Sequence, residues 1–247
     1  MNDNELREKN INNLRNLFKL MGAQKQVSKK NTNLYFSKTW PNRFWMPYDY
    51  EISDLKDLIK INNHKNKIIS LWENNKDIFT EANNELISKE YTVLFEQIGM
   101  YLNMNELDIN LNKDLEVKQV HSKEDIELWT KIASLSFSYK IDSEIIYKVS
   151  KDSNINLLLA YKENIPVGTA LLYKNSSVMG IHLVGVLQKY RKQGIADNIM
   201  KRAISISKEK RIDFMVLQAS MLGLGIYEEL GFKKSFVLKN YQKKEIK

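Results

Sequence analysis

The chain has 247 residues, of which 43% are hydrophobic, so it is long enough for two domains with substantial cores. It has no cysteine, which excludes disulfides and thiol nucleophiles, and its three histidines are too scattered to predict a metal site. No segment approaches the roughly 18 apolar residues of a membrane span, and the N-terminus lacks a signal-peptide core. We therefore expect a cytoplasmic protein that does not associate with membranes.

The net charge of +8 is distributed unevenly along the chain. Residues 1–115 hold 16 basic and 16 acidic side chains, which leaves 22 basic and 14 acidic ones for the rest. A basic second half favours a polyanionic ligand, although a general bias toward Lys and Asn accounts for the charge equally well. The polar segment 107–115 separates the two halves. The expected domains are therefore 1–114 and 115–247.

The first half shows a mixed pattern of helices and strands. The expected elements are a helix at 4–21, two short strands within 34–48 bent at Pro41 and Pro47, a helix at 54–61, a strand at 67–72, and one long strand or a strand pair at 91–104. The aromatic side chains of Trp40, Phe44, Trp45 and Tyr48 suit either a core or the wall of an acceptor pocket, and we favour the core.

The second half predicts a longer alternation of elements and shows no internal repeat by sequence identity. In order, we expect a strand at 116–120, a helix after the capping residue Ser122, a helix at 142–149, strands at 156–161, 167–173 and 178–187, a helix at 193–208, a strand at 214–218, a helix at 223–230 and a strand at 232–241. The fold class is α/β with a mixed sheet, and the first half forms a smaller α/β domain.

The segment from Val184 to Ala196 is the most informative part of the sequence. An apolar strand runs into a basic turn, Arg191-Lys192-Gln193-Gly194, which opens a helix with Ile195 and Ala196. A helix N-terminus carries unpaired N–H groups and a partial positive charge, and glycine lets an anion approach the backbone. The turn is thus a candidate phosphate-binding site.

A second motif follows about thirty residues later, Ile226-Tyr227-Glu-Glu-Leu-Gly231-Phe232. Together the two motifs resemble the acetyl-coenzyme A (acetyl-CoA) motifs of the GNAT acetyltransferase superfamily. Arg191-x-x-Gly194-x-Ala196 is similar to its pyrophosphate loop, and the Tyr227 segment is similar to its C-terminal motif. The resemblance covers residues 116–242. The first half is interpreted as a degenerate GNAT-like domain without the loop.

The resemblance assigns roles to individual residues. Backbone N–H groups of Lys192, Gln193, Gly194, Ile195 and Ala196 would bind the pyrophosphate, with Arg191 and Lys192 adding positive charge. Gly194 is expected because a Cβ would displace the phosphate. The main chain of Val184, Gly185 and Val186 would pair with the pantetheine arm and the acetyl oxygen.

The remaining roles concern proton transfer and the cofactor arm. Tyr227 would assist the departing thiolate. Ser220, where many family members have Asn, would contact the cofactor arm or cap the next helix. His182 is the candidate general base because it shares strand parity with Val184 and Val186. A structural role for His182 and water-mediated deprotonation stay open.

The sequence thus predicts an N-acetyltransferase that moves an acetyl group from acetyl-CoA to a primary amine of a small molecule or peptide, without a metal. One alternative is a non-catalytic acyl-CoA sensor, which would not need the Tyr227 hydroxyl. Another is an acyltransferase directed at RNA or tRNA. Nucleic acid is a less favoured partner because the basic residues form no concentrated run. A homodimer is an open option.

Overall fold

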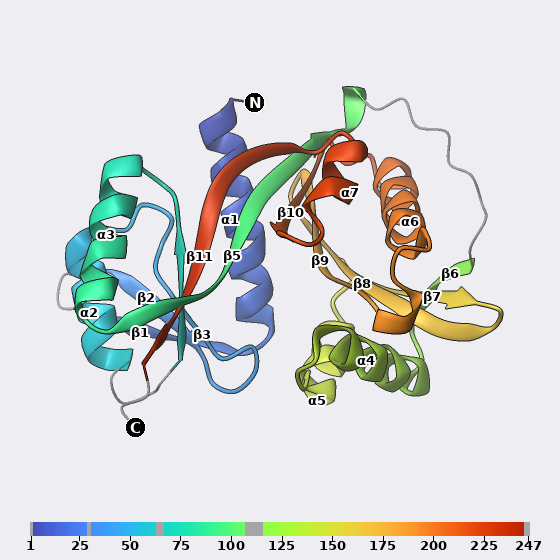
Figure 1. The fold of residues 1–247 in the computed structure, drawn as a ribbon, viewed down its shortest axis with the longest axis horizontal. Helices are drawn as coiled ribbons and strands as arrows, with labels where there is room; N and C mark the ends of the chain where they lie inside the picture. The colour runs from blue at the N-terminus through green and yellow to red at the C-terminus, as the bar shows by residue number, and fades with distance from the viewer. Residues whose placement is uncertain (1, 29–30, 63–66, 107–115, 245–247) are drawn as a thin grey trace. The chain divides into compact units, whose positions relative to one another are not determined.

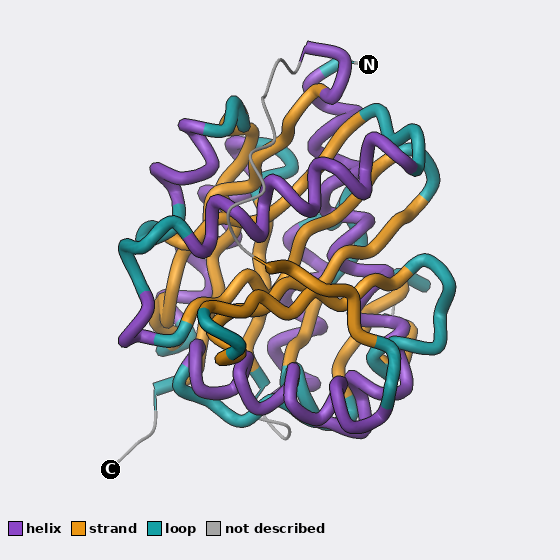
Figure 2. The backbone as a smooth tube through the Cα atoms, turned by 90° about the vertical axis from the view of Figure 1, so that its right-hand side faces the viewer, coloured by secondary structure: helices purple, strands orange, loops and turns teal. Residues whose placement is uncertain are grey.

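The computed structural model describes residues 2–28, 31–62, 67–106 and 116–244, and these fall into two compact units. Unit 1 comprises Met1–Met100, Gln218–Leu224 and Lys234–Lys247, and unit 2 comprises Tyr101–Leu217 and Gly225–Lys233. The domain boundary expected at 114/115 lies outside the described residues. Helices and strands make up most of the described chain (Figure 2).

Unit 1 is a twisted sheet with helices that supply part of its core (Figure 1). Its elements are α1 (Asp3–Leu20), β1 (Ala23–Val27), β2 (Asn33–Ser37), β3 (Arg43–Trp45), α2 (Ile52–Asn62), β4 (Ile68–Trp72), α3 (Lys76–Ser88), most of β5 (Tyr91–Asn103) and most of β11 (Lys233–Lys243). The strand order is β1-β2-β3-β4-β11-β5. β1, β2 and β3 are antiparallel neighbours, whereas β4 lies parallel to β3 after the α2 crossover.

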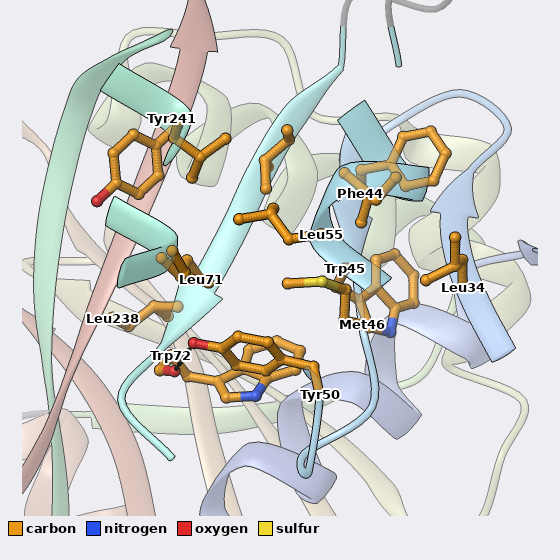
Figure 3. Packing of buried hydrophobic residues seen from close by; sticks show 14 of the residues in the cluster. Leu34, Phe44, Trp45, Met46, Tyr50, Leu55, Leu71, Trp72, Leu238 and Tyr241 are labelled. Carbon is orange, nitrogen blue, oxygen red and sulfur yellow. Dashed lines mark hydrogen bonds between the residues drawn. The ribbon is translucent and has the colours of Figure 1, made fainter. Parts of the chain in front are cut away.

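The core of unit 1 is rich in aromatic side chains (Figure 3). Phe44 and Trp45 are completely buried in it, which confirms the core interpretation for these two residues. Trp45 stacks against Tyr35 with the ring centroids 5.9 Å apart. Such contacts add about 0.5–1.5 kcal/mol to the free energy gained by burial. Trp40 and Tyr48 are half-buried.

Unit 2 contains the predicted elements of the second half except its last strand, β11, which belongs mostly to unit 1. They are β6 (Glu116–Val120), α4 (Lys123–Phe137), α5 (Ser143–Val149), β7 (Ile155–Lys162), β8 (Ile165–Asn175), β9 (Val178–Val186), α6 (Ile195–Glu209), the start of β10 (Phe214–Ser220) and most of α7 (Leu224–Glu229), together with the short 3-10 turns Met104–Glu106 and Gln188–Tyr190. The strand order is β6-β7-β8-β9-β10. The first four strands are antiparallel, and β10 lies parallel to β9.

The two units repeat one topology that sequence identity does not reveal. In each, three antiparallel strands lead through a crossover helix to a parallel fourth strand, and another helix and a long strand follow. The long strand that ends the second series, β11, pairs with β4 inside unit 1. The last residues of β5 belong to unit 2. The second half of the chain therefore contributes a strand to unit 1, and the first half contributes the end of β5 to unit 2.

Two elements of unit 1 were missed by the sequence patterns. β1 is largely exposed, and its apolar and polar residues do not alternate. Its backbone hydrogen bonds with β2 define it as a strand, and these bonds leave no pattern in the sequence. α3 carries a recognisable signal: Asn75 accepts hydrogen bonds from the N–H groups of Asp77 and Ile78 as an N-cap, and Ala82 and Leu86 are buried one turn apart.

Candidate functional site

The turn between β9 and α6 has the backbone geometry of an anion site. Lys192 and Gly194 both adopt positive φ, 58° and 73°, on either side of Gln193. Gly194 is the N-cap of α6, which begins at Ile195, two residues later than expected. When φ changes sign between neighbouring residues in this way, successive backbone N–H groups point toward one side and form a concave site for anions, called a nest.

The N-terminus of α6 lacks the protein cap that other helices have. Side chains of Asn2, Asn75, Ser122 and Asp142 cap α1, α3, α4 and α5, whereas no side chain caps α6. The first N–H groups of a helix have no partner within it. At α6 these donors therefore remain available to an external anion.

Gly194 is required by its backbone conformation rather than by a lack of space. A Cβ built on Gly194 would find only the Asn198 side-chain nitrogen, at 3.8 Å. The φ of 73° disfavours residues with a Cβ. The positive φ is thus a reason for glycine within the chain itself, and the close approach of a phosphate to Gly194 stays a prediction.

Arg191 holds the turn in place. Its Nε donates to the Val186 carbonyl at 3.2 Å and its Nη2 donates to the Ser136 carbonyl at 2.9 Å. The guanidinium thus ties the turn both to the end of β9 and to the last turn of α4. Sequence reasoning gave Arg191 only a charge toward phosphate and missed this clamp, because its acceptors are backbone groups.

The resemblance implies that this turn binds acetyl-CoA, and on that basis we expect Arg191→Lys and Arg191→Met to weaken its binding to a similar degree, about tenfold. A single ammonium cannot reproduce the fixed fork that spans two carbonyls, so restoring the charge should not restore affinity. Calorimetric titration measures the binding. Full affinity in Arg191→Lys would mean that charge alone matters.

Polar side chains also fix the middle of the turn. Gln193 donates through Nε2 to the Lys189 carbonyl at 3.2 Å and accepts from Lys162 Nζ at 2.6 Å. Lys189 and Lys192 are exposed. The turn is therefore preorganised and surrounded by cationic groups, while Asp197 in the first turn of α6 is paired with Lys201 at 2.8 Å.

A β-bulge in β9 changes the faces that the sequence predicted. Leu171 pairs with His182 and Thr169 pairs with Gly185, so β9 has one more residue than β8 between these pairs. Leu183 within the bulge has φ of 51°. His182 therefore shares a face with Gly185, and Val186 lies on the opposite face. The parity argument that grouped His182 with Val184 and Val186 was wrong, because the bulge shifts the alternation by one residue.

The segment 184–186 packs closely against α4 and lies beyond the ladder that joins β9 to β10. A Cβ on Gly185 would lie 2.8 Å from Ser136 Cβ, so glycine allows α4 to pack closely here. The ladder between β9 and β10 runs from the pair Val178 and Phe214 to the pair Ile181 and Leu217. β9 extends beyond this ladder to Val186.

His182 is buried, and its burial lowers the pKa to about 3. A group with so low a pKa is a weak proton acceptor at neutral pH. The base role stays a prediction, and the environment of the side chain weighs against it.

The buried His182 is expected to make stability depend on pH. Its pKa is depressed from 6.5, so its contribution is full above pH 6.5 and is lost as the pH falls toward 3, since only the unfolded state binds the proton there. Wild type should lose about 2–3 kcal/mol more than His182→Gln between pH 6.5 and 4.5, measured by urea unfolding. His121→Gln, at an exposed histidine, is the control and should follow wild type.

Tyr227 lies in α7 and packs edge-on against Phe232, with ring centroids 5.8 Å apart. Burial raises the pKa of Tyr227 to about 12, so the phenol keeps its proton at neutral pH. Within the described chain its hydroxyl makes no hydrogen bond. Its role toward the departing thiolate stays a prediction.

All the predicted site residues except Ser220 belong to unit 2. Ser220 is the exposed last residue of β10 and belongs to unit 1. Its carbonyl accepts from the Gly223 N–H at 3.0 Å, and no side-chain cap by Ser220 is seen in the described chain. Contact with the cofactor arm stays a prediction for Ser220, as the phosphate and pantetheine roles do for the others.

The equivalent turn of unit 1, between β3 and α2, has a different chemistry. It contains no glycine, and the Asp54 carboxylate accepts from the Glu51 N–H at 3.0 Å at the helix start. A carboxylate in that position occupies a donor and repels anions. Of these two turns, both within the described residues, the one in unit 2 has the features of an anion site.

A family model described as "Acetyltransferase (GNAT) domain" matches residues 117–247. The match covers just over half of the chain. The chain therefore belongs to the GNAT acetyltransferase family.

Similar proteins agree with this assignment. A Bacillus subtilis (strain 168) protein, provisionally named an acetyltransferase, is 33% identical over 76 residues, which are 31% of this chain and 52% of that protein. The chain thus matches about half the length of this curated relative.

Solved structures extend the similarity to both halves of the chain. A GCN5-related N-acetyltransferase from Kribbella flavida has a TM-score of 0.69 at 15% identity and covers 94% of this chain and 93% of its own. One from Sphaerobacter thermophilus has a TM-score of 0.65 at 12% identity, covering 90% and 80%. At these identities the likeness shows the fold, and it includes the N-terminal half, which is GNAT-like.

In the described ranges, no helix is long and apolar enough to cross a membrane. Over the same residues, no three His, Asp or Glu side chains are grouped to hold a metal ion. The absence of a metal requirement stays a prediction.

Proposed function

We propose that the protein is an N-acetyltransferase that transfers the acetyl group of acetyl-CoA to a primary amine of a small molecule or peptide in the cytoplasm. The observation that carries the proposal is the uncapped start of α6, preceded by positive φ at Lys192 and Gly194. This turn fits a diphosphate because it offers several N–H donors, a partial positive charge and neighbouring lysines.

We assign each predicted site residue one role in binding or orienting the co-substrate. Lys192 through Ala196 bind the pyrophosphate through main-chain donors, and Arg191 keeps the turn in place. The main chain of Val184, Gly185 and Val186 orients the pantetheine arm and the acetyl carbonyl. Ser220 contacts the arm. The bound co-substrate supplies an acetyl group activated as a thioester.

Proton movement involves Tyr227 and the acceptor amine. The protonated phenol of Tyr227 stabilises the departing sulfur by donating a hydrogen bond. With a pKa near 12 it is a poor donor of a free proton, so hydrogen bonding contributes more than complete transfer. His182 is a weak base at neutral pH, which favours removal of the amine proton through water.

Two measurements test the proposal. Calorimetry with acetyl-CoA should detect binding, and free thiol should appear when the protein meets an accepted amine from a panel of amino acids, polyamines, aminoglycosides and peptides. No binding of acetyl-CoA would contradict the proposal. Binding without thiol release for any acceptor would favour the sensor, and RNA binding that falls steeply with salt would favour the nucleic-acid alternative.

A further inference from the structure

Unit 1 contains a chain of hydrogen bonds between buried polar side chains. Ser70 Oγ donates to Asn240 Oδ1 at 2.9 Å, and Asn240 Nδ2 donates to Gln97 Oε1 at 3.3 Å. Gln97 Nε2 in turn donates to the Gln218 carbonyl at 3.1 Å. Ser70 and Asn240 are only 1% exposed. The chain of bonds thus joins β4, β11, β5 and β10.

The same network holds the side chain of Gln218. Gln218 Nε2 donates to Asn10 Oδ1, and Asn10 Nδ2 donates to the Met100 carbonyl at 3.0 Å. Asn10, on α1, is 1% exposed. Gln218 is therefore fixed at two points, at its carbonyl by Gln97 and at its side chain by Asn10.

Gln218 is the first residue of β10 beyond its ladder with β9. Leu217 is the last residue of β10 in the ladder with β9. The next residue, Gln218, belongs to unit 1 and takes its side-chain bonds there. It precedes Ser220 by two residues and Tyr227 by nine.

We propose that Asn10 and Gln97 are positioning residues for the acetyl-transfer reaction. By holding Gln218, they fix the course of β10 after its ladder with β9 ends, and with it residues 218–224, the segment of unit 1 that contains Ser220 and precedes Tyr227 in the chain. The proposal rests on the proposed function. It gives the GNAT-like half, whose own turn lacks the anion-binding features, a defined part in the reaction.

The physical reason is geometric specificity. Amide hydrogen bonds add little net stability compared with well-packed apolar groups, but each requires a particular distance and angle. A fully satisfied buried network therefore fixes one arrangement of strands. Displacement of reacting groups by about 1 Å can slow catalysis by about 100-fold.

The test compares Asn10→Leu and Gln97→Leu with Asn62→Leu. Asn62 is also 1% exposed and bonded inside unit 1, to Lys67 and Tyr91, so it matches Asn10 in chemistry and burial but not in its link to β10. We expect Asn10→Leu and Gln97→Leu to lower kcat about tenfold or more with little change in KM for acetyl-CoA. Asn62→Leu should lose thermal stability but keep kcat.

Deuterium exchange in the full-length chain gives a readout independent of activity. Amides of residues 219–224 should exchange faster in Asn10→Leu and Gln97→Leu than in Asn62→Leu. Equal exchange in all three variants, or equal loss of kcat, would overturn the proposal. If Asn10→Leu does not fold, the test rests on Gln97→Leu, because Gln97 is half-buried and its replacement disturbs the core less. A wild-type chain that binds no acetyl-CoA would refute the proposed function, whereas the exchange data would still test whether the network holds this segment.

Discussion

Replacing Ala196 by Asp is expected to weaken acetyl-CoA binding by about 100-fold without unfolding the protein. Ala196 is in the first turn of α6, where the uncapped N–H groups lie. A carboxylate about 6 Å from a phosphate costs about 3 kcal/mol at an effective dielectric constant near 20. The same charge stabilises the helix by about 0.3–1 kcal/mol, because it lies near the positive end of the dipole.

Ala196→Asn is the matched control because it has the size of Asp without the charge. It should bind acetyl-CoA far more tightly than Ala196→Asp in calorimetric titrations, and both variants should melt close to wild type. Similar affinities for the two variants would contradict an anion site at this helix start. The opposite signs for binding and stability distinguish electrostatic repulsion from a folding defect.

Tyr227→Phe is expected to lower kcat by about 10²- to 10⁴-fold while acetyl-CoA still binds. The substitution removes one hydroxyl and keeps the ring that packs against Phe232. Because burial raises the pKa of Tyr227 to about 12, the wild-type phenol stays protonated across the physiological range. Its ionisation should therefore not limit the rate below about pH 11.

Steady-state kinetics across a pH series, together with calorimetry, check this prediction. Tyr161→Phe, on β7, is the matched control, because it removes a hydroxyl from another half-buried tyrosine of unit 2, and it should leave kcat unchanged. An unchanged kcat in Tyr227→Phe would remove this residue from the mechanism. A large rise in KM with normal kcat would instead indicate a role in binding.

Local sequence patterns predicted most elements of the fold. The helix predicted at 54–61 is α2 (Ile52–Asn62), and the strand predicted at 67–72 is β4 (Ile68–Trp72). Ser122 caps α4 through the Asp125 N–H as expected. These elements follow from apolar periodicity and short-range capping, which depend on residues near in sequence. β1 escaped prediction because an exposed edge strand has no apolar pattern to detect.

The candidate site was only partly accessible to the same reasoning. The glycine turn stands out because a glycine at the start of a helix lets an anion approach the backbone, and Tyr227 was found through the resemblance of its motif to that of the GNAT family. Two features were not found, the bulge at Leu183 and the Arg191 clamp. A bulge depends on the pairing of two strands, and the clamp joins residues 55 positions apart through backbone carbonyls. Neither leaves a local signature.

The sequence by itself determined the mixed α/β class, the order of most elements, and the position of the glycine turn that is the candidate anion site, because propensities, caps and glycine requirements act over a few residues. Only the tertiary structure decided that His182 and Val186 face opposite ways, that β11 joins unit 1, and that Asn10 and Gln97 hold Gln218. These features arise from hydrogen bonds between distant segments. The packing of the whole chain determines which strands pair, so no short segment of the sequence predicts the partner of a strand.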